Sequence, residues 1–326
     1  MRIFVTGASG FIGAHLCRAL VDGGHEIVAL VRDPKKAAAE LPARGVEALP
    51  GDLSLFERQD VVLPPCDLVI HLAGVVAAKS PEQYDAVNFA AVKSLVQALA
   101  RQTWRPRRLL FASSLAAVGP TATRVPKTER DAAEPIEPYG RAKLKAEQFL
   151  AAEAPFPTTS FRLSLVFGPR DTATLTFFKL AKRGLGFRIA GEPQGLSFID
   201  VDDAVSGIVA MMSDTSDAHR TYFLAAREQM DTELLWRAMS EATERRVRVI
   251  RVPRPVLRGA SVMSTAFSKV FGFTNQLDAK QYDQMVAPAF MCSSAALQAA
   301  HGWVPRVSLV GSLAKAWAAY HADGWL

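Results

Sequence analysis

The feature that most constrains this chain is a glycine-rich turn near its amino terminus. Residues 6–13 read Thr-Gly-Ala-Ser-Gly-Phe-Ile-Gly, after a short apolar run and before a helical pattern of apolar residues. A turn of this kind needs backbone angles that a Cβ forbids, and it lets a diphosphate approach the amides at a helix N-terminus. We therefore predict a dinucleotide site that includes Gly7, Ser9, Gly10, Phe11, Ile12 and Gly13.

Short β-rich runs and helical patterns alternate along the first half of the chain. The predicted strands are Arg2–Thr6, Glu26–Val31, Val46–Pro50, Leu68–His71, Arg108–Ser113 and Thr158–Val166. The predicted helices are Phe11–Asp22, Pro34–Ala43, Glu82–Gln102 and Tyr139–Glu153. Strict alternation indicates a parallel sheet with helices on both faces. The predicted fold class is α/β, a Rossmann-type doubly wound parallel sheet with a smaller C-terminal substrate-binding lobe.

The alternation of strands and helices becomes irregular after Gly168-Pro169, where glycine and proline separate isolated helical segments. We expect residues 1–169 to form the dinucleotide-binding domain, with 196–224 returning to it. Residues 170–195 and 225–326 are expected to form most of the lobe. Ligands bind at the carboxyl edge of such sheets, which places the lobe over the site.

Composition excludes several classes of function. The formal charge of +6 is scattered without a basic stripe, which disfavours nucleic acid. The three cysteines are odd in number, far apart and without a Cys-x-x-Cys motif, so we predict neither disulfides nor a metal site, and a reducing cytoplasm as the compartment. The first apolar run is too short for a signal peptide, and no apolar stretch is long enough to span a bilayer.

The end of the second predicted strand indicates which dinucleotide binds. An NAD site normally places an acidic residue there to bind the ribose hydroxyls, whereas this chain has Val31 followed by Arg32. Arg32 can form a forked contact with a 2′-phosphate, and Lys35 or Lys36 can add charge. The prediction is NADP(H), held partly by Arg32 and Lys36. The alternative is that these side chains belong to a solvated loop.

Two further segments are expected on the adenosine side of the site. Asp52, followed by Leu53, ends the third predicted strand, where its carboxylate could accept a bond from the adenine amino group. The alternative role for Asp52 is a helix N-cap, which Ser54 could fill instead. Leu72, Ala73 and Gly74 follow the fourth strand and would let the backbone lie against the ligand.

Tyr139 and Lys143 are four residues apart and therefore lie on one face of a predicted helix. A neighbouring ammonium should lower the pKa of the phenol and make Tyr139 a usable general acid or base. Ser114, at the end of the fifth strand, can hold a substrate oxygen against this phenol. Ser113 is the adjacent alternative, but strand alternation allows only one of the two serines to face the site. We favour Ser114.

These motifs resemble, in order and spacing, the extended short-chain dehydrogenase/reductase family, whose fold and landmarks would cover essentially the whole chain. The resemblance implies that Ser114, Tyr139 and Lys143 are catalytic and that Asn88 supports the lysine through water. It also implies that Lys143 binds the nicotinamide ribose, and it places Ser113 and the run from Leu163 to Val166 beside the nicotinamide. Leu163 stands where the family pattern has proline, which weakens that last placement.

The resemblance also bears on the reaction. The segment around Arg32 resembles the dihydroflavonol-reductase-like branch, and 113–120 resembles the 3β-hydroxysteroid-dehydrogenase-like branch. Sugar dehydratases of this fold carry Asp-Glu after the serine position, where this chain has Leu115 and Ala116. Elimination chemistry is therefore disfavoured.

The hypothesis that follows is an NADP(H)-dependent oxidoreductase that interconverts a ketone or aldehyde and an alcohol on an apolar small molecule. Two alternatives are a nucleotide-sugar epimerase and a non-catalytic NADP(H) sensor. The apolar segment 252–273 could be a packed lobe helix, a lid over the substrate or a membrane-touching surface, the last being the least favoured. Asp200, Asp202 and Asp203 are expected to be caps and loop anchors. A homodimer through the helices at 82–102 and 139–153 is carried over from the family.

Overall fold

The computed structural model describes residues 1–261 and 279–326. A seven-stranded sheet forms the larger part of the molecule, with strand order β10-β6-β5-β4-β1-β2-β3 and every neighbouring pair parallel. Its strands are β1 Arg2–Thr6, β2 Glu26–Val31, β3 Val46–Pro50, β4 Leu68–His71, β5 Arg108–Ser114, β6 Thr158–Leu163 and β10 Arg220–Leu224. The chain order reverses between β1 and β4, which is the point where ligands bind in doubly wound sheets. The predicted fold class is confirmed.

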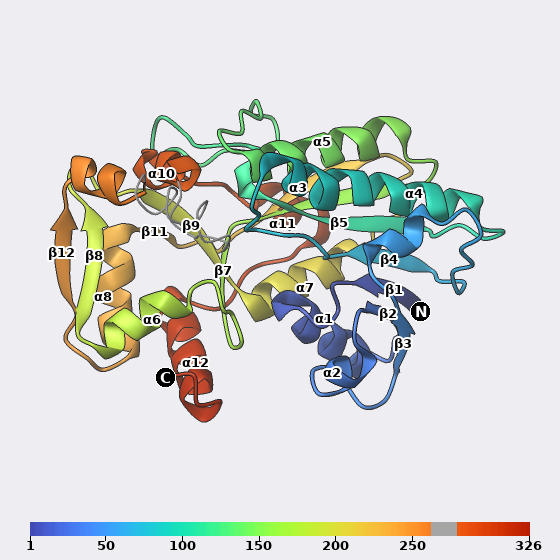
Figure 1. Cartoon of the computed structure of the whole chain (residues 1–326), viewed down its shortest axis with the longest axis horizontal. Coiled ribbons are helices and arrows are strands. Elements are labelled where there is room, and N and C mark those ends of the chain that lie inside the picture. Colours follow the sequence, from blue (N-terminus) through green and yellow to red (C-terminus); the bar gives the residue numbers. More distant parts are fainter. Residues whose placement is uncertain (262–278) are drawn as a thin grey trace.

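Helices cover both faces of this sheet (Figure 1). One face carries α1 Phe11–Asp22, α2 Pro34–Ala38 and α7 Val201–Met211. The other carries α3 Pro81–Asp85, α4 Ala91–Arg101 and α5 Pro138–Glu153, with a π-helical turn at Ala86–Ala90 between α3 and α4. The apolar strand residues alternate between two buried clusters, one beneath each layer of helices. Burial on both faces explains why the central strands β1, β2 and β4 are mostly apolar.

The structure differs from the predicted elements in three places. The helix predicted to reach Ala43 ends at Ala38, because Pro42 disfavours helical geometry in the residue before it. The long helix predicted before Gln102 contains the π-helical turn. The strand predicted to reach Val166 breaks at Ser164, whose N–H and hydroxyl both donate to the carbonyl oxygen of Leu224, at 3.1 and 2.9 Å.

Beyond this break the chain builds the lobe. A four-stranded sheet contains β7 Leu165–Phe167, β9 Gly195–Asp200, β11 Gln229–Asp231 and β13 Ala289–Phe290. A separate parallel pair contains β8 Leu185–Ile189 and β12 Arg248–Val252. The remaining labelled helices are α6 Leu175–Lys182, α8 Thr232–Ala242, α10 Ala279–Val286, α11 Ala295–His301 and α12 Leu309–Ala322. Aromatic side chains from α6, β9, α8 and α12 share the core of the lobe.

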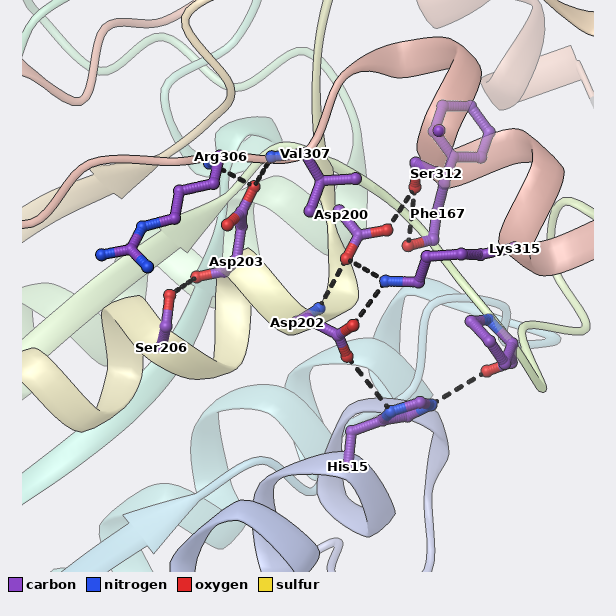
Figure 2. Close-up of polar contacts among 12 residues, drawn as sticks. His15, Phe167, Asp200, Asp202, Asp203, Ser206, Arg306, Val307, Ser312 and Lys315 are labelled. Carbon is purple, nitrogen blue, oxygen red and sulfur yellow. Dashed lines mark hydrogen bonds and ion pairs between the residues drawn. The ribbon is translucent and has the colours of Figure 1, made fainter. Parts of the chain in front are cut away.

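A polar network joins the first and last helices (Figure 2). The buried carboxylate of Asp200 accepts bonds from the Asp202 N–H at 2.9 Å, from the Ser312 hydroxyl at 2.6 Å and from Lys315 at 3.0 Å. Lys315 also contacts Asp202, which lies 3.7 Å from His15 of α1. Asp203 accepts bonds from the N–H groups of residues 306 and 307. These contacts confirm caps and loop anchors as the roles of Asp200 and Asp203.

Two further observations concern covalent and membrane chemistry. Cys17, Cys66 and Cys292 are free and buried. Within the described residues, none of the helices combines the length and the apolar character needed to cross a bilayer. The amphipathic segment proposed at 252–273 lies partly outside the described residues, from position 262 onward.

Candidate active site

The glycine turn at the end of β1 has almost no room for side chains. Gly7 has a φ of +74°, and a Cβ there would lie 2.7 Å from the backbone nitrogen of Ala73. A Cβ on Gly13 would lie 2.1 Å from the carbonyl oxygen of Gly7, and one on Gly10 would lie 3.1 Å from the same atom. Ser9 and Gly10 are exposed, whereas Phe11 and Ile12 are partly buried. The turn is thus an exposed cradle of backbone at the start of α1, which fits a diphosphate.

The next strand end presents a cluster of exposed positive charge. Arg32, Lys35 and Lys36 are all exposed, and the Asp33 side chain caps α2 by accepting bonds from the N–H groups of both lysines. Asp52 accepts bonds from the N–H and the hydroxyl of Ser54, at 2.9 and 2.6 Å, and these bonds lower its carboxyl pKa, with a smaller contribution from Arg32. Asp52 therefore caps the 3-10 helix Leu53–Glu57, so the structure shows the alternative role. Contact with adenine stays a prediction.

Gly74 lies against the two side chains that the sequence placed deeper in the site. A Cβ on Gly74 would be 2.7 Å from Oδ1 of Asn88 and 3.2 Å from Nζ of Lys143. Asn88 is fully buried in the π-helical turn. Its Oδ1 accepts a bond from the Val75 N–H at 3.1 Å, and its amide donates to the Val75 carbonyl at 2.9 Å. The structure therefore brings Asn88 and Lys143 together at the loop that begins with Leu72 and Ala73.

Ser114 and Tyr139 meet at the carboxyl edge of the sheet. The Ser114 hydroxyl is near enough to the phenol to lower its pKa, and its oxygen accepts the N–H of Ala116 at 3.1 Å. Two neighbours set the position of the phenol. Glu137 caps α5 by accepting the N–H groups of Tyr139 and Gly140, at 2.8 and 2.7 Å. A Cβ on Gly140 would lie 2.1 Å from the Ala116 carbonyl oxygen, so glycine lets α5 pack directly on the chain after β5.

The pKa expected for the phenol was wrong in direction. Burial raises the pKa of Tyr139 to about 12, while the nearby Ser114 hydroxyl opposes this rise. The Lys143 ammonium donates to the carbonyl oxygen of Ala112 at 2.7 Å and lies 4.7 Å from the Phe111 ring centroid and 5.9 Å from that of Tyr139, while burial is the largest influence on the phenol pKa. Burial also lowers the pKa of Lys143 itself to about 7, so its charge is only partial at neutral pH. Tyr139 is consequently a protonated phenol, ready to donate.

The two serines at the end of β5 contact different residues of α5. The Ser113 hydroxyl is buried and donates to Glu147, which forms a buried ion pair with Arg162 at 2.6 Å. The side chain of Ser113 is therefore bonded inside the fold, and only its backbone remains for a cofactor contact. Leu163 and Val166 are partly buried on either side of the break at Ser164.

His71 ends β4 beside this loop and is fully buried. Its Nδ1 is 2.7 Å from the Thr6 hydroxyl, and its ring stacks on Phe111. Burial lowers the pKa of His71 to about 3, so the ring is neutral and does not act as the base.

The sequence interpretation missed Glu137 and Gly140, although both are visible beside Tyr139. It also missed an apolar cavity of about 500 Å³ in the lobe, lined by residues from β7, α6, β8 and α8, among others. No periodic pattern marks that cavity, because its walls come from segments that are far apart in sequence.

Comparison with known proteins places this site in a family. The model of the NAD dependent epimerase/dehydratase family matches residues 3–225, which include the glycine turn, Ser114, Tyr139 and Lys143. The chain belongs to this family. It is an extended short-chain dehydrogenase/reductase, and members of this group depend on NAD or NADP.

Three similar proteins show the range of the family. A ceramide reductase of Caulobacter vibrioides is 27% identical over 334 residues, covering 99% of this chain and 96% of the relative. A 4-hydroxy-2-methyl-3-oxo-4-farnesyl-3,4-dihydroquinoline-1-oxide ketoreductase of Stigmatella aurantiaca is 27% identical over 267 residues, covering 80% and 79%. The solved UDP-glucose 4-epimerase of Thermotoga maritima, with UDP-glucose, has a TM-score of 0.78 at 20% identity and covers 99% of both chains. This last likeness concerns the fold.

Proposed function

We propose that this protein is an NADP(H)-dependent oxidoreductase that interconverts a ketone or aldehyde and an alcohol on an apolar substrate. The observation that carries the proposal is the approach of the Ser114 hydroxyl to the Tyr139 phenol at the carboxyl edge of the sheet. Two hydroxyl groups at this point can hold one carbonyl oxygen between them. The cytoplasm is the compartment we propose.

In this proposal Gly7, Gly10 and Gly13 admit the diphosphate, Arg32 and Lys36 bind the 2′-phosphate, and Lys143 binds the nicotinamide ribose. A bound NADPH supplies the hydride. Ser114 positions the substrate oxygen, and Tyr139 donates the proton to that oxygen during reduction. In the reverse direction the same phenol oxygen accepts the proton. Asn88 fixes the loop beside Lys143 through its two bonds to Val75.

The apolar substrate is supported by the cavity and by two relatives. Leu165, Phe177 and Trp236 are among the residues that line the cavity. The ceramide reductase and the farnesyl-quinoline ketoreductase are both named for reducing molecules with long apolar parts. The match to the ceramide reductase runs the length of the chain, so it includes the lobe.

The test is NADPH oxidation, followed by absorbance, with a panel of long-chain and cyclic ketones and with UDP-sugars. The proposal predicts turnover of at least one apolar ketone and none of the sugars. Epimerisation of a UDP-sugar without net consumption of NADPH would establish the alternative reaction. Failure of every carbonyl compound, in protein that binds NADPH, would remove the oxidoreductase.

A further inference from the structure

The lobe cavity contains a buried positive charge that the proposed reaction does not use. Arg188 lies in β8, lines the cavity and has only 8% of its surface exposed. One of its terminal nitrogens, Nη1, donates to the carbonyl oxygens of Ile189 and Gly191, at 3.2 and 2.8 Å. No ion pair joins Arg188 to an acidic residue within the described residues.

A buried guanidinium without a carboxylate is costly, because carbonyl oxygens replace only part of its hydration. The other charged residues of the cavity do not supply the missing partner. Arg124 and Arg254 add positive charge, and Arg124 is engaged with Asp231 at 3.6 Å. Glu192 is the carboxylate among the described lining residues, and it is exposed at the rim with no ion pair to Arg188. The cavity is therefore an apolar space with an unneutralised cation in its wall.

Two of the segments that line the cavity come from the carboxyl edge of the main sheet. One wall contains residues 122–124, which continue the segment that leaves Ser114 at the end of β5. Another contains Leu165, which directly follows the break between β6 and β7. The volume of about 500 Å³ lies within the range of small-molecule sites. A molecule that fills the lobe is thus bounded by the same two segments that leave the carboxyl edge.

We propose that the cavity binds an amphiphile whose anionic group, a phosphate monoester or a carboxylate, pairs with Arg188. The chain of the amphiphile packs on Phe177, Phe187 and Trp236, and the anion accepts the guanidinium donors that the two carbonyls leave free. This inference rests on the proposed function in one respect, since the amphiphile is taken to be the carbonyl substrate. It deepens that proposal by adding a charged group to the apolar substrate class.

Binding can be measured without any reaction. Titration calorimetry with octyl phosphate, octanoate, octanol and octylammonium compares four headgroups on one chain, each below its micellar concentration. The wild-type protein should bind octyl phosphate or octanoate at least about tenfold more tightly than octanol, as expected for charge-assisted bonds. Octylammonium should bind more weakly than octanol. Equal affinity for the anionic and neutral compounds in the wild-type protein would overturn the proposal, whatever the variants do.

Two methionine variants form a matched pair. Arg251 of β12 is the register partner of Arg188 and is exposed, so Arg251→Met removes a nearby arginine that does not line the cavity. Arg188→Met should abolish the preference for the anion and leave octanol affinity unchanged, whereas Arg251→Met should keep the preference. A preference that persists in Arg188→Met contradicts the proposal. Thermal unfolding and NADPH binding establish that both variants are folded.

Turnover separates this inference from the proposed function. A long-chain keto acid and its methyl ester differ by one negative charge and one methyl group, so the acid should show the higher kcat/KM in the wild-type protein and lose that advantage in Arg188→Met. Equal rates for the acid and the ester would be consistent with the proposed ketone reductase and would contradict the proposal that the substrate is anionic. If no ketone reacts, the proposed function fails and calorimetry alone decides whether the cavity binds an anionic amphiphile.

Discussion

Lys143 of α5 donates a hydrogen bond to the main-chain carbonyl oxygen of Ala112 in β5, 2.7 Å away. Ala112 is two residues before Ser114, so this bond ties the helix that carries Tyr139 to the strand that carries its hydroxyl partner. The lysine therefore positions the phenol through the backbone, in addition to the ribose contact proposed for it.

Replacement of the phenol tests the proton donor. Tyr139→Phe should bind NADPH with unchanged affinity and lose about 10²- to 10⁴-fold in kcat, the range typical of general acid catalysis. Tyr84→Phe is the matched control, because the two rings are 6.2 Å apart and Tyr84 has no role in the proposed proton transfer. Steady-state kinetics and NADPH fluorescence give both quantities. Near-normal turnover in Tyr139→Phe would eliminate the proposed acid.

Replacement of Arg32 tests the choice of dinucleotide. Arg32→Ala should raise the KM for NADPH about 10- to 100-fold, since a charge-assisted pair with the 2′-phosphate is lost, and should leave NADH kinetics unchanged. Arg44→Ala removes an exposed arginine that precedes β3, at the amino ends of the strands, whereas Arg32 lies at the carboxyl ends. It should change neither the KM for NADPH nor the kinetics with NADH. A parallel loss with both dinucleotides would mean that Arg32 does not read the phosphate.

A methyl group at Gly74 tests the contact with Asn88. Gly74→Ala places a Cβ 2.7 Å from Asn88 Oδ1, so the asparagine or the loop must move. We expect kcat/KM to fall by on the order of 10- to 100-fold, since displacement by about 1 Å is enough for such losses. Gly259→Ala is the control, because none of the described atoms lies within 4 Å of its Cβ. Unaltered kinetics would show that this close approach is dispensable.

The buried lysine gives stability a specific pH dependence. Burial lowers the pKa of Lys143 to about 7 from 10.5, so between these values the unfolded chain binds more protons than the folded one. The cost of burying the ammonium is full below pH 7 and is relieved as pH rises toward 10.5. Without dinucleotide, the free energy of unfolding of wild type minus that of Lys143→Met should therefore increase from pH 7 to pH 10. Urea denaturation at several pH values measures both free energies of unfolding. A difference between them that does not change with pH would refute the lowered pKa of Lys143.

The network of Figure 2 predicts a loss of stability without a loss of chemistry. Lys315→Met removes the cation beside the fully buried Asp200 and should cost about 1–2 kcal/mol in the free energy of unfolding. Lys182→Met, an exposed lysine at the end of α6, should cost much less. Urea titration compares the two. Equal effects would show that the pairing with Asp200 contributes nothing.

The sequence predicted what depends on local pattern and missed what depends on packing. The strands from Arg2 to His71 and the helix after the glycine turn could be read from apolar periodicity, because both sheet faces are buried. The break at Ser164 could not, since beyond it the chain leaves β10 and pairs with β9, a strand that lies far away in the sequence. The direction of the Tyr139 pKa failed for a related reason. Spacing placed Lys143 on the correct face of the helix. The hydrogen bond from its ammonium to the Ala112 carbonyl oxygen depends instead on how α5 packs against β5.

The bridge from His15 through Asp202 to Lys315 has a practical consequence. α1 starts at the glycine turn, and Lys315 belongs to α12. Asp202 therefore joins two helices that lie far apart in the sequence. A version shortened before residue 309 would leave the Asp200 carboxylate without Ser312 and Lys315, next to Asp202 and its contact with His15 of α1. Such a truncation would also remove Leu309, Leu313, Ala316 and Tyr320 from the core of the lobe, so it should be seen first as a loss of stability. Affinity tags are therefore better added after Leu326 than substituted for the final helix.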